Sequence, residues 1–141
     1  MSNVLYDFEK FMKRREEIAQ AYVNGDAAPL GEITTNLNPA TFFSPGGDYK
    51  QGSVQVYSTY ESDAKKFASG KTNFEILQMG ASDNIAYWVG FQRATVFLEG
   101  NTQGVPFNLR ITEIFRLEDN EWKLVHRHAD ALKSEIKENK E

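Results

Sequence analysis

A single carboxylate stands among apolar residues in one strand-like segment of the sequence. Glu113 alternates with Leu109, Ile111, Phe115 and Leu117, and alternate residues of a strand share one face. A buried carboxylate without a partner costs several kcal/mol or takes up a proton. Glu113 therefore either reaches water at the edge of a sheet or meets a cationic partner inside the molecule, where it could anchor a ligand or move a proton.

The next strand-like segment along the chain carries that cationic partner and two histidines. A hairpin between the two segments would bring Arg127 close to Glu113. Such a pair would hold the pKa of Glu113 low, which makes the carboxylate a poor general acid but a good anchor for a polar ligand group. His126 and His128 share one side of the strand with Asp130. A metal site with two histidines and one carboxylate is one interpretation, but a third ligand with a clear role is missing, so we expect no metal and a structural or interface role for both histidines.

The composition is typical of a globular domain without thiol chemistry. The 141 residues are 40% hydrophobic and 13% aromatic, which is enough to line a pocket as well as to fill one core. The formal net charge of -4 argues against a nucleic-acid partner, because such proteins usually carry a basic face. The sequence has no cysteine, which excludes disulfides and cysteine-based zinc sites. We expect no cofactor.

No segment of the sequence has the pattern of a targeting or membrane segment. The first residues mix acids with bases and contain no long apolar core, so we expect no signal peptide. The longest apolar stretch, about Ile85 to Phe91, is far shorter than the roughly 20 residues of a spanning helix. These features predict a cytoplasmic protein with no membrane partner.

Three helices are predicted in the first half of the chain. Apolar residues recur at helical spacing from Asp7 to Asn24, with charged residues mostly opposite, and Gly25 can end that helix. A short second helix has Pro29 in its first turn and ends at Asn38-Pro39. The third helix is predicted from about Ser53 to Ser69.

The second half of the chain changes to a strand pattern. β-branched and aromatic residues dominate four segments: Asn73–Met79, Ile85–Glu99, Val105–Leu117 and Trp122–Ala131. A short β-prone segment at 40–44 precedes a glycine-rich loop at 45–52. The short linkers predict an antiparallel meander, and helices gathered before a continuous sheet predict an α+β fold. We expect one domain over residues 1–141, with 1–6 and 133–141 as flexible ends.

Several short motifs follow one another in a characteristic order. They are Asn24-Gly25-Asp26, Phe43-Ser44-Pro45-Gly46-Gly47, Gln51-Gly52, Arg110-Ile111-Thr112-Glu113-Ile114-Phe115-Arg116 and Trp122-Lys123-Leu124-Val125-His126-Arg127-His128. Over roughly residues 7–132 the chain resembles the nuclear-transport-factor-2-like (NTF2-like) superfamily, and within it the SnoaL-like proteins of the DUF4440 kind. The resemblance implies a cone-shaped fold, in which three N-terminal helices pack on a strongly curved antiparallel sheet around a pocket.

The resemblance also allows a test of catalysis, residue by residue. The ketosteroid isomerases of this superfamily need a carboxylate base and two acidic donors. Their base position falls at Ser44, their tyrosine donor at Ile18 and their remaining acid at Glu113. A serine hydroxyl is no base near neutral pH without an activator, and isoleucine has no proton to give. The arginines that mark the pockets of the related kinase association domains fall at Val89, Glu113 and Ala129, so that ligand preference is not expected here.

The family register implies a pocket face and an outer face for the sheet. The residues expected in the ligand pocket are Glu113, Arg127, Tyr57, Tyr60, Tyr87, Phe91, Ile18, Tyr22 and Phe115. The residues expected on the outer face, at a homodimer interface, are Trp88, Trp122, Leu124, His126 and His128. An apolar outer face of this size is too large to leave in water, which favours a dimer.

Three functions follow as hypotheses. The first is a homodimeric domain that binds a small, largely apolar molecule without established catalysis. The second is a cyclase, isomerase or dehydratase that acts on a small hydrophobic substrate and uses Glu113, Tyr57 or Tyr60 in place of the usual base. The third is an association module that assembles into larger rings. Because one fold hosts many functions, the residues of the site must decide between them.

Overall fold

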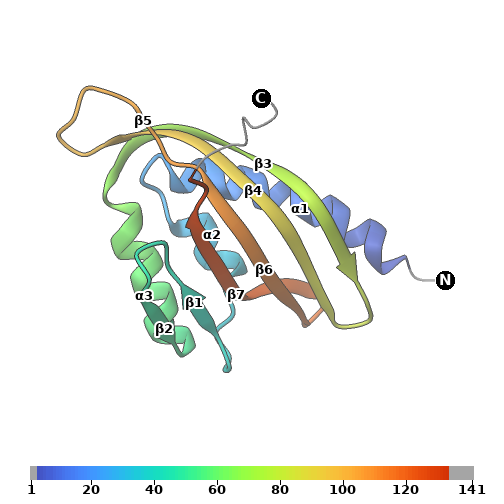
Figure 1. Ribbon diagram of the computed structural model, residues 1–141. Helices are drawn as coiled ribbons and strands as arrows, with labels where there is room; N and C mark the ends of the chain where they lie inside the picture. The colour runs from blue at the N-terminus through green and yellow to red at the C-terminus, as the bar shows by residue number, and fades with distance from the viewer. Residues whose placement is uncertain (1–2, 134–141) are drawn as a thin grey trace.

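The structure, a computed structural model, describes residues 3–133 and contains helices and strands in the predicted order (Figure 1). The helices are α1 (Val4–Tyr22), α2 (Ala28–Ile33) and α3 (Ser53–Ala64). The strands are β1 (Thr41–Phe43), β2 (Tyr49–Gln51), β3 (Phe67–Ala81), β4 (Ile85–Leu98), β5 (Val105–Pro106), β6 (Leu109–Glu118) and β7 (Glu121–Ala131). In the described residues no helix is both long and apolar enough to cross a membrane.

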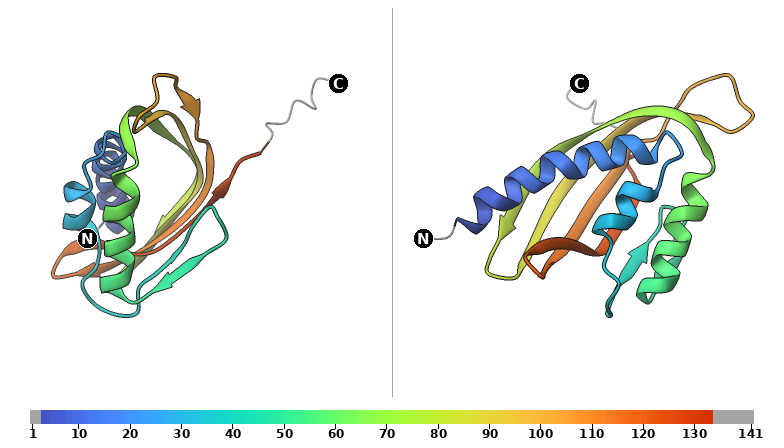
Figure 2. Two further views of the ribbon diagram at one scale, coloured as in Figure 1. Left: turned by 90° about the vertical axis from the view of Figure 1, so that its left-hand side faces the viewer. Right: turned by 180° about the vertical axis from the view of Figure 1, so that it is seen from behind.

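The strands form one curved, unclosed sheet with the helices on its concave side (Figure 2). Its order is β2-β1-β7-β6-β4-β3, and β5 pairs with β4. Neighbouring strands are antiparallel except β1 and β7, which are parallel. The predicted α+β class and curved sheet are confirmed.

Helix α1 lies along the inside of the sheet and is longer than predicted. It begins at Val4 rather than Asp7, because the Asn3 side chain accepts a hydrogen bond from the backbone N–H of Tyr6 (2.9 Å) and caps the first turn. Residues 4–6, expected in a flexible end, therefore belong to the helix. Gly25, with φ of 90°, follows the end of the helix. Of the other positions expected in flexible ends, 3 and 133 are described, and 1–2 and 134–141 lie outside the described residues.

Helix α3 is shorter than predicted, and β3 takes over its last residues. The helix ends at Ala64, and residues from Phe67 onward pair with the end of β4. The predicted helix to Ser69 was wrong because pairing with a distant strand outweighs local helical spacing. Similarly, part of the predicted glycine-rich loop forms β2, which pairs with β1.

An extra residue in β7 decides which of its side chains face the helices. The register between β6 and β7 shifts at Val125, and a bulge of this kind puts two residues opposite one. Arg127 and Ala129 face inward, as expected, but so do Trp122 and Leu124, which are buried. The expectation that Trp122 and Leu124 lie on the outer face was wrong. It assumed strict alternation along the strand without the bulge, which puts these two residues and Arg127 on different faces of the sheet.

The two faces of β4 are the reverse of the expectation. Trp88 is fully buried and lies directly opposite Glu113 of β6, and directly opposite residues share a face of the sheet. Tyr87 and Phe91 alternate with Trp88 and lie on the outer side, where the Tyr87 hydroxyl donates to Gln78 (3.0 Å). The prediction that Trp88 lies at an interface was wrong, and so was the prediction that Tyr87 and Phe91 line the pocket. Since β4 has aromatic residues on both faces, only its register with Glu113 distinguishes them.

Candidate functional site

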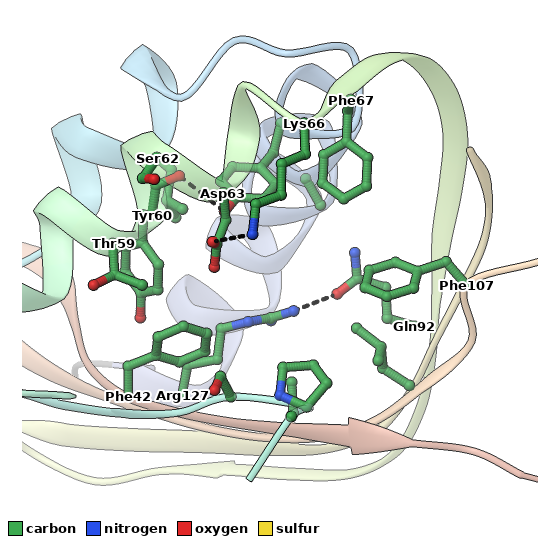
Figure 3. Close-up of a pocket in the computed structure, with 18 of the residues that line it drawn as sticks. Phe42, Thr59, Tyr60, Ser62, Asp63, Lys66, Phe67, Gln92, Phe107 and Arg127 are labelled. Carbon is green, nitrogen blue, oxygen red and sulfur yellow. Dashed lines mark hydrogen bonds and ion pairs between the residues drawn. The ribbon is translucent and has the colours of Figure 1, made fainter. Parts of the chain in front are cut away.

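The concave side of the sheet encloses a cavity of about 710 Å³ (Figure 3). Its floor is formed by inward residues of the sheet, and its opposite wall by the end of α3 and the start of β3. The apolar part of the lining is Ala19, Leu30, Phe42, Phe67, Leu98, Phe107, Leu109 and Ala129. This mixture of aromatic and aliphatic walls with a few polar groups is typical of a small-molecule site.

One row of side chains crosses the sheet beneath this cavity. Trp88 of β4 lies opposite Glu113 of β6, Glu113 lies opposite Arg127 of β7, and Arg127 is in register with Phe42 of β1. Residues in such a row lie close enough for direct contact. The sheet register alone therefore brings the carboxylate, the indole and one arginine together.

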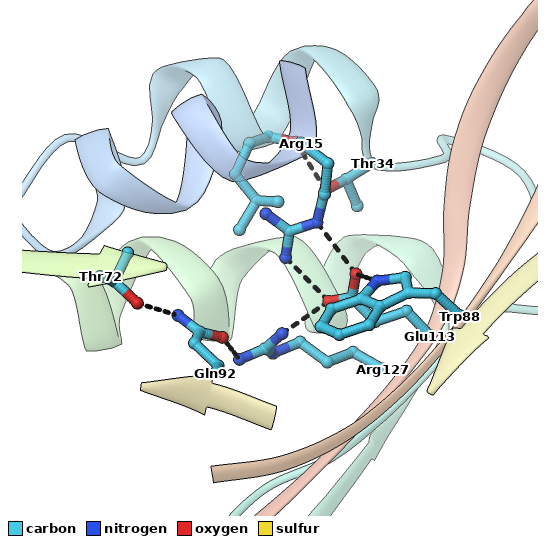
Figure 4. A network of polar contacts seen from close by, with 8 residues as sticks. Arg15, Thr34, Thr72, Trp88, Gln92, Glu113 and Arg127 are labelled. Atoms are coloured by element: carbon cyan, nitrogen blue, oxygen red, sulfur yellow. Dashed lines mark hydrogen bonds and ion pairs between the residues drawn. The ribbon is translucent and has the colours of Figure 1, made fainter. Parts of the chain in front are cut away.

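Glu113 is completely buried and accepts four hydrogen bonds (Figure 4). Its Oε1 accepts from Nε of Arg15 (3.0 Å) and from Nε1 of Trp88 (2.9 Å). Its Oε2 accepts from Nη2 of Arg15 (2.8 Å) and from Nη1 of Arg127 (2.6 Å). A carboxylate has about four acceptor sites, so all of them are used. The predicted pair of Glu113 with Arg127 is present, but Glu113 lies behind the arginines and does not line the cavity.

These contacts keep Glu113 ionised. Burial alone would raise its pKa, but the charges of Arg15 and Arg127, with the hydrogen bonds from Arg15 and Trp88, outweigh burial and hold the pKa at about 2. A carboxylate that is ionised, saturated and shielded from the cavity neither donates nor accepts a proton from a ligand near neutral pH. Its contribution is to fix the two guanidinium groups.

Arg15 of α1 is the main residue of the site that the sequence interpretation missed. It is only 2% exposed and binds Glu113 through two parallel hydrogen bonds, the fork geometry that arginine makes with carboxylates. The signal was present, because Arg15 follows Met12 by three residues and precedes Ile18 by three, within the apolar stripe of the helix. A charge within an apolar stripe indicates a buried partner.

Arg127 is held at both ends of its guanidinium group and reaches the cavity. Its Nη2 donates to Oε1 of Gln92 (2.9 Å), and Nε2 of Gln92 donates to the hydroxyl of Thr72 (3.3 Å). The Thr72 hydroxyl in turn donates to the backbone oxygen of Arg93 (2.9 Å). This chain fixes the orientation of the Gln92 amide, so the Arg127 side chain has one position along the cavity floor.

Of the four tyrosines predicted in the pocket, Tyr22 and Tyr60 line the cavity. The Tyr22 hydroxyl donates to the backbone oxygen of Tyr60 (2.9 Å), and both residues belong to the lining. Burial raises the pKa of both hydroxyls, so each stays protonated near neutral pH and acts as a donor, not as a base. The Tyr57 hydroxyl instead donates to the backbone oxygen of Ala27 (3.4 Å), and Tyr57 is not part of the lining.

The other predicted site residues lie apart from the cavity. Ile18 and Phe115 are buried in the main core and do not line the cavity, and the Phe115 ring packs 5.4 Å from that of Phe8. Both residues lie on the inward faces of α1 and β6, and for this reason they were expected in the pocket. Part of these inward faces packs into the hydrophobic core instead. Ser44 does lie in the lining.

His126 and His128 lie on the outer side of the sheet, next to β1. The His126 Nδ1 is 2.7 Å from the Thr41 hydroxyl, and both imidazoles pack against the Phe43 ring, with centroids 5.0 and 5.4 Å away. Within residues 3–133 no group of three His, Cys, Asp or Glu side chains is arranged to hold a metal ion. Neither histidine lines the cavity.

The sequence and the fold were compared with known proteins. The sequence model of the SnoaL-like domain matches residues 13–131. The chain belongs to the SnoaL-like family. This SnoaL-like chain shares its fold with proteins of the NTF2-like superfamily. A search of the curated proteins finds no match to its sequence.

Solved structures with this fold have low sequence identity to the SnoaL-like chain. A candidate dehydratase of the NTF2-like family from Streptomyces avermitilis has a TM-score of 0.80 at 15% identity, covering 94% of this chain and 100% of that one. An NTF2-like superfamily protein from Salmonella enterica serovar Typhimurium has a TM-score of 0.74 at 15% identity, covering 92% and 94%. A candidate aromatic ring hydroxylase from Novosphingobium aromaticivorans has a TM-score of 0.65 at 17% identity, covering 90% and 87%. At these identities the likeness shows the fold alone.

Proposed function

We propose that this SnoaL-like protein binds a small, largely apolar molecule in the cavity on the concave side of its sheet. The observation that carries the proposal is the cavity itself, about 710 Å³ with walls of Phe42, Phe67, Phe107 and neighbouring leucines. Protein interiors are otherwise packed with few voids larger than a water molecule. A space of this size with an aromatic lining therefore favours an apolar occupant.

The three residues that were candidates for catalysis, Glu113, Tyr57 and Tyr60, support binding better than they support catalysis. Glu113 is saturated and ionised, and Tyr57 does not line the cavity. Tyr60 does line it, but its hydroxyl is protonated near neutral pH because burial raises its pKa. The set thus offers one hydrogen-bond donor and no base, whereas cyclisation, isomerisation and dehydration each need a proton acceptor.

The test is binding of a neutral fluorescent probe, N-phenyl-1-naphthylamine, followed by its emission in the apolar environment. Ala129→Phe places a ring on the cavity floor, and we expect it to reduce probe affinity by at least tenfold. Ala131→Phe, at the exposed end of the same strand, is the matched control and should bind as wild type does. Equal affinity of all three proteins would show that the probe binds elsewhere and would contradict the proposal.

The outer face of the sheet supports the further proposal of a homodimer. Tyr87 and Ile85 of β4 and Phe43 of β1 are among its large exposed apolar side chains, and exposed apolar side chains on a sheet face favour a protein partner. We expect a dimer at micromolar concentration by light scattering with mass determination. A monomer would contradict the dimer, and a larger ring would favour an association module.

A further inference from the structure

The geometry points to a carboxylate as the polar group of the bound molecule, with Arg127 as the residue that recognises it and the aromatic walls holding an aryl or medium-length hydrocarbon body. This assignment rests on the proposed function, because it names the chemical class of ligand for the same cavity. Three observations carry it: the charge of the buried cluster, the count of its hydrogen-bond donors, and the fixed position of Arg127.

The buried cluster has an excess of one positive charge. Arg15 and Arg127 both bind the one carboxylate of Glu113, whose side chain is fully buried. No other described ion pair involves either arginine. The acids in the cavity lining are Asp48 and Asp63, and Asp63 is paired with Lys66 (3.3 Å). An uncompensated charge away from water is costly, so an anion on the cavity side of the cluster would be stabilised.

The donors of the cluster are only partly used. Each guanidinium has five N–H groups, and the described hydrogen bonds use two from Arg15 and two from Arg127. Glu113 has no acceptor site left for the remaining N–H groups, since Trp88 occupies the fourth. Both arginines line the cavity. The remaining N–H groups that face the cavity are therefore available to water or to acceptor atoms of a ligand.

Arg127 is the better placed of the two arginines to meet a ligand. Its side chain is 12% exposed, against 3% for Arg15, and Figure 3 shows it extended across the cavity floor between Phe42 and Gln92. Because Glu113 and Gln92 fix the guanidinium from two sides, little conformational entropy is lost when it binds an anion. A planar fork with fixed orientation matches a carboxylate.

The surrounding charges agree with one singly charged anion. The lining contains Lys50 and Lys66 as well as Asp48 and Asp63, so its outer part is balanced and the excess charge belongs to the floor. A molecule with its carboxylate at Arg127 would place its hydrocarbon part beside Phe67, Phe107 and Leu98. The ligand class that fits both Arg127 and the apolar walls of the cavity is a monocarboxylic acid with an aromatic or aliphatic body.

The experiment compares 2-naphthoate with its neutral isostere 2-naphthamide at pH 7, by displacement of N-phenyl-1-naphthylamine. We expect wild type to prefer the acid by roughly 10- to 100-fold, the range of a charge-assisted hydrogen-bonded contact. Arg127→Met should lose that preference while it binds the amide within about threefold of wild type, which also shows that its cavity is folded. Arg14→Met removes the same charge from the exposed side of α1 and should keep the preference.

Two results would overturn the carboxylate assignment. One is equal affinity of wild type for acid and amide, or no displacement by either compound. The other is a preference for the acid that survives in Arg127→Met. In each case the proposed function stands if the neutral probe still binds and Ala129→Phe still blocks it. Failure of the probe to bind wild type at all would instead remove the proposed function.

Discussion

Replacement of Glu113 by glutamine tests whether the buried charge cluster stabilises the fold. Glutamine has nearly the same volume, but it replaces one carboxylate oxygen with an amino group that must face N–H donors of Arg15 or Arg127. It also leaves two buried guanidinium groups without a counter-charge. Removing one partner of a buried ion pair typically lowers the free energy of unfolding by about 3–5 kcal/mol.

The pKa of Glu113 provides a second measure of how much the charge cluster contributes to the free energy of unfolding. It falls from an ordinary 4.5 to about 2 in the folded protein, and each pKa unit corresponds to about 1.36 kcal/mol, giving roughly 3 kcal/mol. Since the folded-state pKa is the lower one, this stability is fully present above about pH 4.5. It is lost as the pH falls toward 2, because the unfolded chain takes up the proton first.

The assay is urea unfolding followed by tryptophan fluorescence, for wild type and Glu113→Gln, at pH 7 and at steps down to pH 2.5. We expect the free energy of unfolding to differ by about 3–5 kcal/mol at pH 7 and the difference to shrink below pH 4.5. Glu32→Gln breaks an exposed ion pair with Arg14 and should cost less than about 1 kcal/mol. A difference between wild type and Glu113→Gln below about 1 kcal/mol at pH 7, or a difference that does not change with pH, would refute the reasoning.

Three further substitutions test neighbouring parts of the site. Arg15→Met should lower the free energy of unfolding by about 3–5 kcal/mol, whereas Arg14→Met should change it by less than about 1 kcal/mol; equal effects would contradict burial of only one of them. Trp88→Phe removes one hydrogen bond to Glu113 and should cost about 1–3 kcal/mol in urea unfolding, with the acid transition moving to higher pH. Gly90→Ala should prevent native pairing of β3 with β4, because its Cβ would overlap a backbone oxygen of β3; a native circular dichroism spectrum and unchanged melting would contradict this.

The sequence predicted the fold class and one ion pair, but not the complete cluster. Element order and periodicity were sufficient for the helices and the sheet, because these depend on local patterns. Glu113 and Arg127 were found since a charge in an apolar strand needs a partner. Arg15 lies 98 residues from Glu113, and only its place within the apolar stripe of α1 could have indicated it.

The errors at the site come from register, which local patterns do not specify. The bulge at Val125 turns Trp122 and Leu124 inward, and one residue of slip reverses every side chain of a strand. Trp88 was misplaced for the related reason that β4 is aromatic on both faces. In both strands the correct face follows only from pairing with β6, which is a tertiary property.

The saturation of Glu113 also constrains how this sequence can diverge. Three side chains, from two strands and one helix, donate four hydrogen bonds to the carboxylate of Glu113, so the fitness effect of changing one of these four residues depends on the others. A lineage that loses Glu113 retains two mutually repelling cations close together, and a lineage that loses Arg15 retains an anion with fewer hydrogen-bond donors. Tolerated replacements should therefore arise as concerted exchanges at positions 15, 88, 113 and 127, with apolar residues entering together. Strong epistasis among these four positions is the evolutionary signature that the architecture imposes.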